Sequence, residues 1–316
     1  MQLVSALADL TPDDFPDGSA VAVGKFDGLH LGHRAIVASL LRTAERDGLR
    51  SVVLTFENNP LSLLQPEACP LPLASPRQRL ELLEAAGVDV CVMVEFDKAF
   101  AAIPAREFVE QVLVERLNVR HVLLGEDFRF GHRGLGDAAL LRELGPAHGF
   151  TAEAVQSVGD DAHEAVSSTL IRDAVLSGDL PAARAMLGRC HAVRGTVVHG
   201  DARGRELGFP TANLGGAVEG LVPAHGVYAG AVVIDGVERD AAISVGVNLT
   251  FEPEGEARVE AFVLDFAGDL YGKQMEVRFA ERIREMLPFS SVDALIERMH
   301  EDVAQTREIL DRVREG

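Results

Sequence analysis

Residues 19–33 read SAVAVGKFDGLHLGH, an apolar run followed by a glycine-rich turn and the start of a helical pattern. The run Ser19–Phe26 is typical of a buried strand. A helix is predicted from about His33 to Gly48, because apolar residues recur there at helical spacing and a glycine can end it. The stretch therefore predicts a strand that turns directly into a helix.

The same alternation continues on the C-terminal side, as far as about Gly188. Further strands are predicted at Ser51–Phe56, Val88–Phe96, His121–Gly125 and Thr151–Val158, and helices at Ser75–Gly87, Pro104–Asn118 and Asp137–Gly149. This order indicates a doubly wound, Rossmann-like parallel sheet with helices on both faces. Because such sheets bind ligands beyond the carboxyl ends of their strands, the loops after Phe26, Phe56 and Gly125 are candidate binding loops.

After about Gly188 the pattern changes to closely spaced strands. They are predicted at Val193–His199, Gly226–Ile234, Val237–Val247, Arg258–Phe266 and Lys273–Ile283. Asp235-Gly236 is a strong signal for a two-residue hairpin turn. We expect a small antiparallel barrel followed by a long helix from about Ser291, and two domains spanning residues 1–187 and 188–316.

Composition limits the classes of partner. The 316 residues include 49 acidic and 30 basic side chains, a formal net charge of −19, which argues against a nucleic-acid partner. It does not argue against nucleotides, which a few amides, one metal ion and one or two arginines can bind. The three cysteines are widely spaced, so a reducing cytoplasm fits best. No signal peptide or membrane span is expected, and self-association into a homo-oligomer stays open.

The first candidate site follows the first strand. Its glycines, which include Gly24 and Gly32, let the backbone of Lys25 and Phe26 approach an anion, and free amides at a helix start attract phosphate. His30 and His33 are three residues apart and can face the same point, where they would stabilise charge that builds on an α-phosphate. Two surface histidines or half of a metal site are the alternative interpretations.

A second candidate segment, residues 166–172, reads VSSTLIR. Ser167 or Ser168 can serve as the N-cap of a helix, which is a purely structural role. Ser167, Ser168 and Thr169 with Arg172 one turn later could equally hold the pyrophosphate that leaves ATP.

A third candidate lies in the second domain, where residues 200–214 read GDARGRELGFPTANL. Its glycines, Gly204 and Gly208 among them, could wrap a nucleotide. Thr211 and Asn213 lie on the same side of an extended segment and offer two oxygens, enough for Mg²⁺ that keeps its waters and phosphate ligands. An ordinary turn entering a strand is the alternative, and the loop is no Walker A motif.

These blocks resemble a known family. The first domain looks like the adenylyltransferase domain of the bacterial bifunctional riboflavin kinase/FAD synthetases, through G-K-F-D-G-x-H-x-G-H, residues 125–131 (GEDFRFG) and S-S-T-x-I-R. The resemblance implies that His30 and His33 act as FMN attacks the ATP α-phosphorus, while Ser168, Thr169 and Arg172 hold phosphates. It also implies flavin or nucleotide contacts from Asn59, Gly125, Asp127 and Phe128. Without a tryptophan, flavin stacking would use a phenylalanine, with Phe26, Phe128 and Phe251 as candidates.

The second domain resembles the flavin kinases, which are six-stranded barrels that bind MgATP and riboflavin. The resemblance rests on residues 203–214, RGRELGFPTANL, and on later matching blocks. It assigns Gly204, Gly208, Phe209 and Pro210 to the ATP site and Thr211 and Asn213 to Mg²⁺. It also assigns Glu260 as the base that takes the proton from the riboflavin hydroxyl. The expected products are FMN and then FAD.

The chain also departs from the family pattern. Residues 57–60 read ENNP where the family has E-P-H-P, and Arg133 lies one position early. Asn248-Leu249 and Phe262 differ as well, without removing a proposed ligand or the base. These departures keep two alternatives open: a riboflavin kinase with weak or lost adenylyltransferase activity, and a non-catalytic flavin or nucleotide sensor. A nicotinamide or pantetheine adenylyltransferase would share the first domain but lack the barrel.

Overall fold

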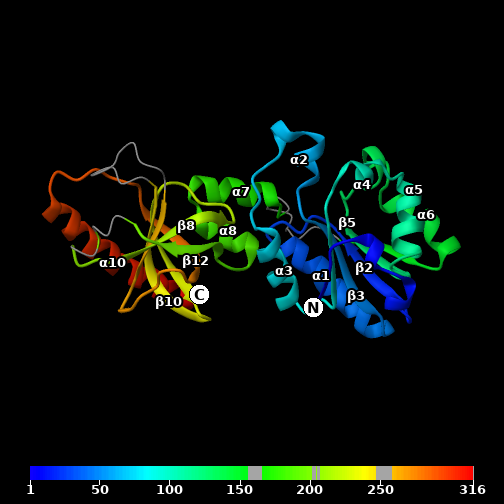
Figure 1. The fold of residues 1–316 in the computed structure, drawn as a ribbon, viewed down its shortest axis with the longest axis horizontal. Coiled ribbons are helices and arrows are strands. Elements are labelled where there is room, and N and C mark those ends of the chain that lie inside the picture. Colours follow the sequence, from blue (N-terminus) through cyan, green and yellow to red (C-terminus); the bar gives the residue numbers. More distant parts are fainter. Residues whose placement is uncertain (156–165, 201–203, 205–206, 247–257, 316) are drawn as a thin grey trace. The chain divides into compact units, whose positions relative to one another are not determined.

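The chain folds into two compact units, Met1–Ser167 and Ser168–Gly316, in a computed structural model (Figure 1). The structure describes residues 1–155, 166–200, 204, 207–246 and 258–315. Each unit is considered by itself below.

The first unit is built on a six-stranded, fully parallel sheet in the order β1-β4-β3-β2-β5-β6. Its strands are β1 (Gln2–Val4), β2 (Ser19–Val23), β3 (Arg50–Phe56), β4 (Val90–Val94), β5 (Val119–Gly125) and β6 (Thr151–Val155). The expected doubly wound sheet is confirmed. The edge strand β1 was not predicted, because three residues are too few to show a period.

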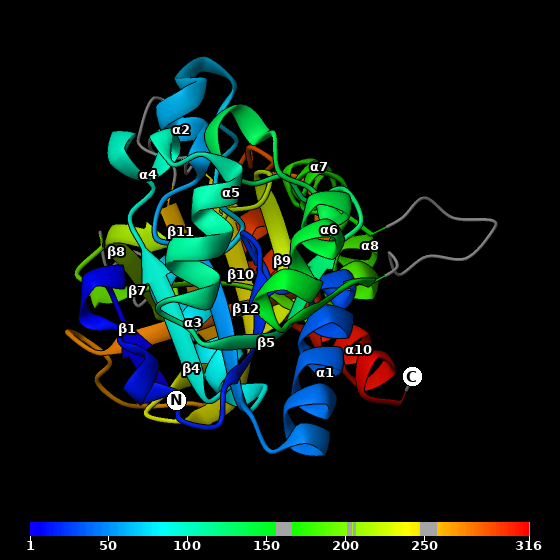
Figure 2. The ribbon, with the colours of Figure 1, turned by 90° about the vertical axis from the view of Figure 1, so that its right-hand side faces the viewer.

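Helices cover both faces of this sheet, as Figure 2 shows. They are α1 (Leu31–Asp47), α2 (Pro60–Leu64), α3 (Pro76–Ala85), α4 (Lys98–Ala102), α5 (Ala105–Glu107) and α6 (Ala138–His148), with short 3₁₀ turns at Leu7–Asp9, Pro12–Asp14, Pro66–Ala68 and His132–Gly134. Their ends follow from the sequence: Ser75 forms a capping box with Gln78, Asp137 caps α6, and Gly48 and Gly149 end their helices in the left-handed conformation.

Strand residues alternate between two buried layers. Ala20 and Ala22 of β2 pack with α1 and α3, whereas Val21 and Val23 pack on the opposite face with residues 105–117 and α6. Because successive side chains of a strand point to opposite faces, a sheet buried on both sides needs an unbroken apolar run. The run of β2 is of this kind, and every residue in it is buried.

The predicted helix Pro104–Asn118 is present but ends earlier, at Val114, and is only partly an α-helix. After α5 the chain forms a π-helix, Phe108–Val114, with the Glu115 N–H donating to the Glu110 carbonyl five residues back. Phe108, Val109, Val112 and Leu113 are buried in this segment and belong to the core on one face of the sheet.

The order of the strands fixes where a ligand can bind. From β2 the chain moves outward to β3 and β4, and it later returns to β5 on the other side of β2. The order therefore reverses between β2 and β5, and in doubly wound sheets the loops at the carboxyl ends of such a strand pair are where ligands bind. These are the loops that begin at Gly24 and Glu126, two of the three predicted from the sequence.

The second unit is a closed antiparallel barrel in the order β10-β11-β8-β7-β12-β9. Its elements are α7 (Ser168–Ser177), α8 (Leu180–Leu187), β7 (His191–Val198), β8 (Thr211–Glu219), β9 (Gly226–Ile234), β10 (Val237–Gly246), β11 (Arg258–Val263), β12 (Gln274–Arg284) and α10 (Val292–Glu315). The six-stranded barrel with a C-terminal helix is confirmed. The Asp235-Gly236 turn has positive φ at both residues, as a hairpin of type I′ requires.

Helices α7 and α8 pack together, and α8 packs on β7 and β12 of the barrel. Residues 168–187 thus fall in the second compact unit. The domain boundary at residues 187 and 188 stays a prediction.

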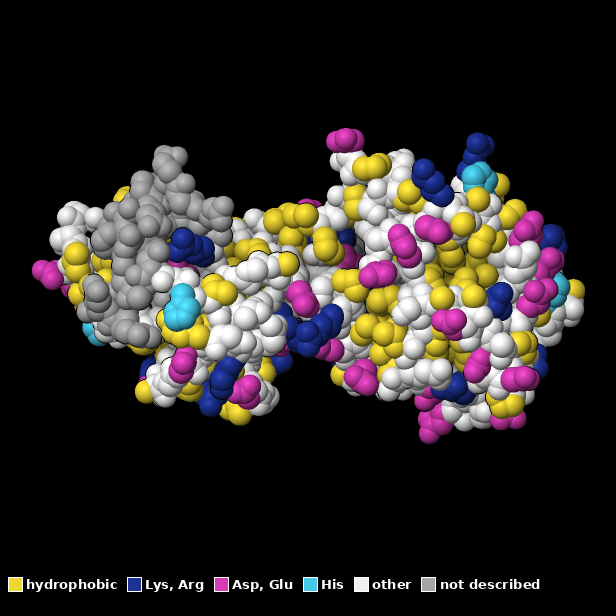
Figure 3. Space-filling model, in the orientation of Figure 1, with side chains coloured by type: hydrophobic (Ala, Val, Ile, Leu, Met, Phe, Trp, Pro, Cys, Tyr) yellow, Lys and Arg dark blue, Asp and Glu magenta, His cyan; other side chains and the backbone are white. Residues whose placement is uncertain are grey.

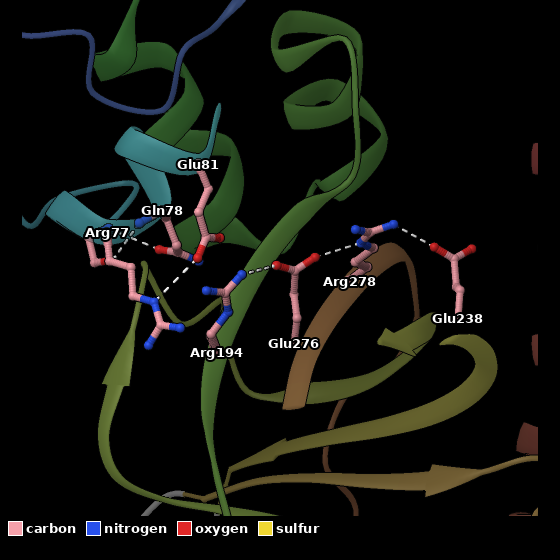
Figure 4. Close-up of polar contacts among 8 residues, drawn as sticks. Arg77, Gln78, Glu81, Arg194, Glu238, Glu276 and Arg278 are labelled. Carbon is pink, nitrogen blue, oxygen red and sulfur yellow. Dashed lines mark hydrogen bonds and ion pairs between the residues drawn. The ribbon is translucent and has the colours of Figure 1, made fainter. Parts of the chain in front are cut away.

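Ion pairs extend across the barrel strands. Figure 4 shows a row in which Arg194 of β7 binds Glu276 of β12, Glu276 binds Arg278, and Arg278 binds Glu238 of β10. Arg194 and Glu276 are direct cross-strand neighbours, the geometry in which opposite charges support an antiparallel sheet.

The C-terminal helix is attached by a more buried ion pair. Asp302 of α10 binds the Arg284 guanidinium through both oxygens, with contacts of 2.7 to 3.2 Å, and lies 3.1 Å from Arg298 Nε. The Asp302 and Arg284 side chains are only 5% and 12% exposed. Removing one partner would leave the other charge buried without compensation.

We therefore expect Asp302→Asn to lower the free energy of unfolding of the second unit by about 3 kcal/mol. The chain has no tryptophan, and both tyrosines, Tyr228 and Tyr271, belong to this unit. Urea unfolding of the whole chain, followed by tyrosine fluorescence, reports on the barrel selectively.

Glu301 on the same helix supplies the matched control. It pairs with Arg298 at 2.7 Å but is 53% exposed, so Glu301→Gln should cost less than about 1 kcal/mol. Equal effects of the two substitutions would contradict the importance assigned to the buried pair.

Candidate functional sites

The loop after β2 has an unusual backbone. Phe26 and Leu29 adopt positive φ angles of 49° and 40°, a region that residues other than glycine rarely occupy. The Phe26 side chain is 1% exposed and packs against His33. Such strain persists only where surrounding contacts hold it, and it is concentrated at functional sites.

Hydrogen bonds to other segments of the first unit hold this loop. The Thr55 hydroxyl at the end of β3 donates to the Lys25 carbonyl at 3.0 Å. The Asp27 carboxylate accepts from the backbone N–H groups of Leu73 and Ala74 at 2.9 and 3.2 Å. The loop is therefore tied both to the sheet and to the segment that precedes α3.

The two histidines lie together at the start of α1. His30 is the N-cap residue, and its Nδ1 accepts from the His33 backbone N–H at 3.3 Å. The two rings stack with centroids 3.7 Å apart. Because Nδ1 of His30 is the acceptor, its neutral ring carries the proton on Nε2 and can donate from there. His30 is 6% exposed, so it is not a surface histidine.

His33 is held in its neutral form. Burial, and secondarily the adjacent His30, lower the pKa of His33 well below its usual value of 6.5. Its Nδ1 is buried and has no hydrogen-bond partner among the described residues. Within the described part of the chain no three His, Cys, Asp or Glu side chains are grouped to hold a metal ion.

Gly32 lies between the histidines for a steric reason. A Cβ atom there would lie 3.1 Å from His30 Cε1 and 3.7 Å from the Val166 carbonyl oxygen. The same distances show that the chain returns to the histidines at Val166, just before Ser167. Ser167 ends the first unit, while Ser168, Thr169 and Arg172 begin α7 of the second. Their role as a pyrophosphate cradle stays a prediction.

The loops after β3 and β5 contain the other predicted contacts. Asn59 caps α2 through Oδ1, which accepts from the Leu61 N–H at 3.0 Å. Asn58 bonds both the N–H and the carbonyl of Phe96. The two departures from the family pattern thus have structural roles here.

At the end of β5, the Phe128 N–H donates to the Gly125 carbonyl and forms a turn. Asp127 is exposed at that turn, whereas Phe128 is half-buried and stacks on Phe130. Phe251, another stacking candidate, lies outside the described residues, as do Asn248 and Leu249. Flavin contacts from these residues stay predictions.

The barrel brings the third candidate group together. Thr211 and Asn213 are on β8, and Glu260 is on the neighbouring strand β11 directly opposite Asn213. The Thr211 hydroxyl donates to Glu260 Oε2 at 3.1 Å. A hydroxyl, an amide and a carboxylate therefore share one patch of the barrel wall, although Glu260 is 47 positions after Asn213 in sequence.

The side-chain oxygen of Asn213 makes no hydrogen bond within the described part of this patch. The residue is 7% exposed, and its Oδ1 is buried with no hydrogen-bond partner among the described residues. An amide oxygen beside a hydroxyl and a carboxylate is the donor set that Mg²⁺ prefers. These residues fit the ion that the sequence predicts.

A close backbone contact lies in the segment that leads to this patch. The Phe209 N–H donates to the Gly204 carbonyl at 2.7 Å, and a Cβ atom on Gly204 would lie 2.4 Å from the Phe209 carbonyl oxygen. Gly208 has a φ of +86°. The glycines thus allow a tight turn leading through Pro210 to Thr211, with the Phe209 ring buried against Phe262 and His300.

The geometry of the two sites indicates the class of enzyme to which the chain belongs. A doubly wound sheet with histidines at its switch point is suited to nucleotidyl transfer, and a barrel with a Mg²⁺-compatible patch beside a carboxylate is suited to phosphoryl transfer. The chain is a two-domain phosphorus-group transferase.

Comparisons with known proteins specify the class. The family models described as FAD synthetase and Riboflavin kinase match residues 13–170 and 187–310. Bifunctional riboflavin kinase/FMN adenylyltransferases are 39% identical over 307 residues in Pseudomonas fluorescens and 34% identical over 309 residues in Escherichia coli K12. These alignments cover 97% and 98% of this chain and 97% of each relative. The chain belongs to the bifunctional riboflavin kinase/FMN adenylyltransferase family.

A solved structure supports the shared architecture. The macrolide-efflux protein from Streptococcus pneumoniae has a TM-score of 0.85 and 35% identity, with 96% of this chain and 98% of that chain covered. That protein's name refers to efflux, an activity absent from both family descriptions. No helix in the described part of this chain is long and apolar enough to cross a membrane.

We expect the His33 imidazole to stay neutral between about pH 6 and 8, because burial opposes its charged form. An NMR titration of the ring signals, with His33→Gln used to assign the resonance, measures this. A midpoint at or above about 6.5 would contradict the buried, unpaired geometry.

Proposed function

We propose that the two units act in series on one vitamin. Riboflavin and ATP give FMN and ADP in the barrel unit, and FMN with a second ATP gives FAD and pyrophosphate in the first unit. The observation that carries this proposal is that both family models match, one after the other, on a single chain.

In the first reaction Glu260 is the proposed general base. The 5′-hydroxyl of riboflavin is a poor nucleophile until its proton has an acceptor, and a carboxylate in contact with a hydroxyl group is suited to take it. The attacking oxygen bonds to the γ-phosphorus as the bond to ADP breaks. The existing contact between Thr211 and Glu260 is support for this role, because it shows the carboxylate acting as an acceptor.

Thr211 and Asn213 are the proposed ligands of Mg²⁺ with ATP. Mg²⁺ bound there would neutralise charge on the phosphate oxygens. The partnerless Oδ1 of Asn213 supports this assignment, since burying an unsatisfied amide oxygen costs free energy unless a ligand completes it.

In the second reaction the loop after β2 is the proposed phosphate site. A phosphate oxygen of FMN attacks the ATP α-phosphorus, and pyrophosphate leaves. The nucleophile is already anionic, so no general base is required. The backbone of Gly24, Lys25 and Phe26 and the N–H of His30 Nε2 would face the charge that develops on the α-phosphate.

The neutral state of His33 suits this task. A neutral imidazole donates a hydrogen bond without the cost of burying a charge. Ser167, Ser168, Thr169 and Arg172 are proposed to hold the leaving pyrophosphate through hydroxyls, backbone amides and a guanidinium. Asn59, Gly125, Asp127 and Phe128 are proposed flavin or nucleotide contacts at the carboxyl ends of their strands.

The setting proposed for the enzyme is the cytoplasm. Cys69, Cys91 and Cys190 are all free thiols, as expected where disulfides are reduced. Small-molecule substrates are the only partners proposed. Figure 3 shows acidic side chains dispersed over the visible face of the first unit, a surface unsuited to nucleic acid.

Chromatography of the products tests the proposal. Purified protein mixed with riboflavin, ATP and Mg²⁺ should accumulate FMN first and FAD afterwards. FMN alone would instead favour a kinase with lost adenylyltransferase activity. The departure from the family pattern at Asn58 and Asn59 is the reason for considering this alternative. Bound flavin with no turnover would favour a sensor.

Glu260→Gln should slow FMN formation by roughly 10²–10⁴-fold, the usual contribution of a general base. The variant keeps the size of the side chain while removing its charge. Conversion of added FMN to FAD by the same sample is the internal control and should be unchanged. FMN formation at the wild-type rate would leave Glu260 as an ordinary carboxylate of the barrel wall.

A further inference from the structure

Arg79 of α3 is a buried arginine with an unusual set of partners. It is 7% exposed, and its two terminal nitrogens donate to backbone carbonyls: Nη1 to Lys25 at 3.0 Å and Nη2 to Glu57 at 2.8 Å. Its Nε is buried without a hydrogen-bond partner among the described residues. Burial lowers the pKa of Arg79, an effect that Asp27 partly opposes, but an arginine remains charged.

The two carbonyls belong to two different binding loops. Lys25 lies in the loop after β2, and Glu57 lies in the loop after β3. One guanidinium therefore clamps two neighbouring strand ends at fixed separation. Lys also carries a charge, but only the planar fork of arginine presents two donors in a rigid geometry.

The clamp also fixes the direction of one peptide unit. The Lys25 carbonyl accepts from both Arg79 and Thr55. The peptide bond to Phe26 is trans, so the Phe26 N–H points the opposite way from that carbonyl. This N–H donates to no described residue, and the positive φ of Phe26 keeps the peptide in this strained orientation.

We propose that Arg79 is a positioning residue for adenylyl transfer, which holds the Lys25–Phe26 peptide so that the Phe26 N–H faces the α-phosphate of ATP. The inference rests on the proposed function of the loop after β2. Arg79 touches no reacting atom itself; it acts through the backbone that it binds.

Arg79→Met tests the proposal, because methionine fills much of the volume and removes both donors. We expect kcat for FAD formation from FMN to fall by roughly 10²-fold, the cost of a small misplacement of a reacting group. Arg79→Lys should recover part of the loss through one retained donor. The kinase reaction of the same chain should be unchanged.

A second readout separates positioning from simple loss of folded protein. The two diastereomers of ATP with sulfur on the α-phosphorus differ only in which α-oxygen is replaced. A smaller fraction of folded enzyme slows both equally, whereas a misplaced donor changes the ratio of their rates. We expect this ratio to move several-fold toward unity in Arg79→Met.

Arg77 provides the matched control on the same helix. Its side chain is 61% exposed and pairs with Glu81 (Figure 4), so Arg77→Met should change neither the rate nor the diastereomer ratio. A reduced rate with an unaltered ratio in Arg79→Met would overturn the positioning role. Failure of the wild-type protein to make any FAD would instead overturn the proposed function.

Discussion

A buried polar atom without a partner costs free energy, and this chain maintains one at each of its two candidate sites. Of the five buried side-chain atoms that lack a hydrogen-bond partner in the described structure, three are arginine Nε atoms. The other two are His33 Nδ1, at the switch point of the sheet, and Asn213 Oδ1, on the barrel wall. In the proposed function, an incoming triphosphate or its metal ion would complete both atoms.

The two units reach this arrangement by different means. In the first unit the strand order reverses between β2 and β5, and hydrogen bonds of the Thr55, Asp27 and Arg79 side chains hold a strained loop there. In the second unit, antiparallel pairing of β8 with β11 places Glu260 beside Thr211 and Asn213. Rigid scaffold contacts thus fix the positions of these groups before any ligand binds, which is the basis of preorganised electrostatic catalysis.

Much of this could be predicted from local patterns in the sequence. The β2–loop–α1 unit is visible because its apolar run, glycines and helical period all lie within a short stretch, and Thr211 and Asn213 share a face by strand geometry alone. The role of Glu260 was predicted only from family resemblance. Local patterns could not indicate it, because the pairing of β11 with β8 depends on closure of the barrel. Arg79 could not be distinguished from the exposed Arg77 beside it, since its partners are carbonyls distant in sequence. The π-helix and β1 likewise depend on tertiary packing rather than on periodicity.

The central claim is that one chain holds two separate triphosphate sites, one in each unit. The most direct test is the binding stoichiometry of a non-hydrolysable ATP analogue with Mg²⁺, measured by isothermal titration calorimetry on the whole protein. The account predicts two equivalents per chain for the wild type, and one when Asn213 is replaced by leucine. A single equivalent for the unmodified protein at saturation would contradict it.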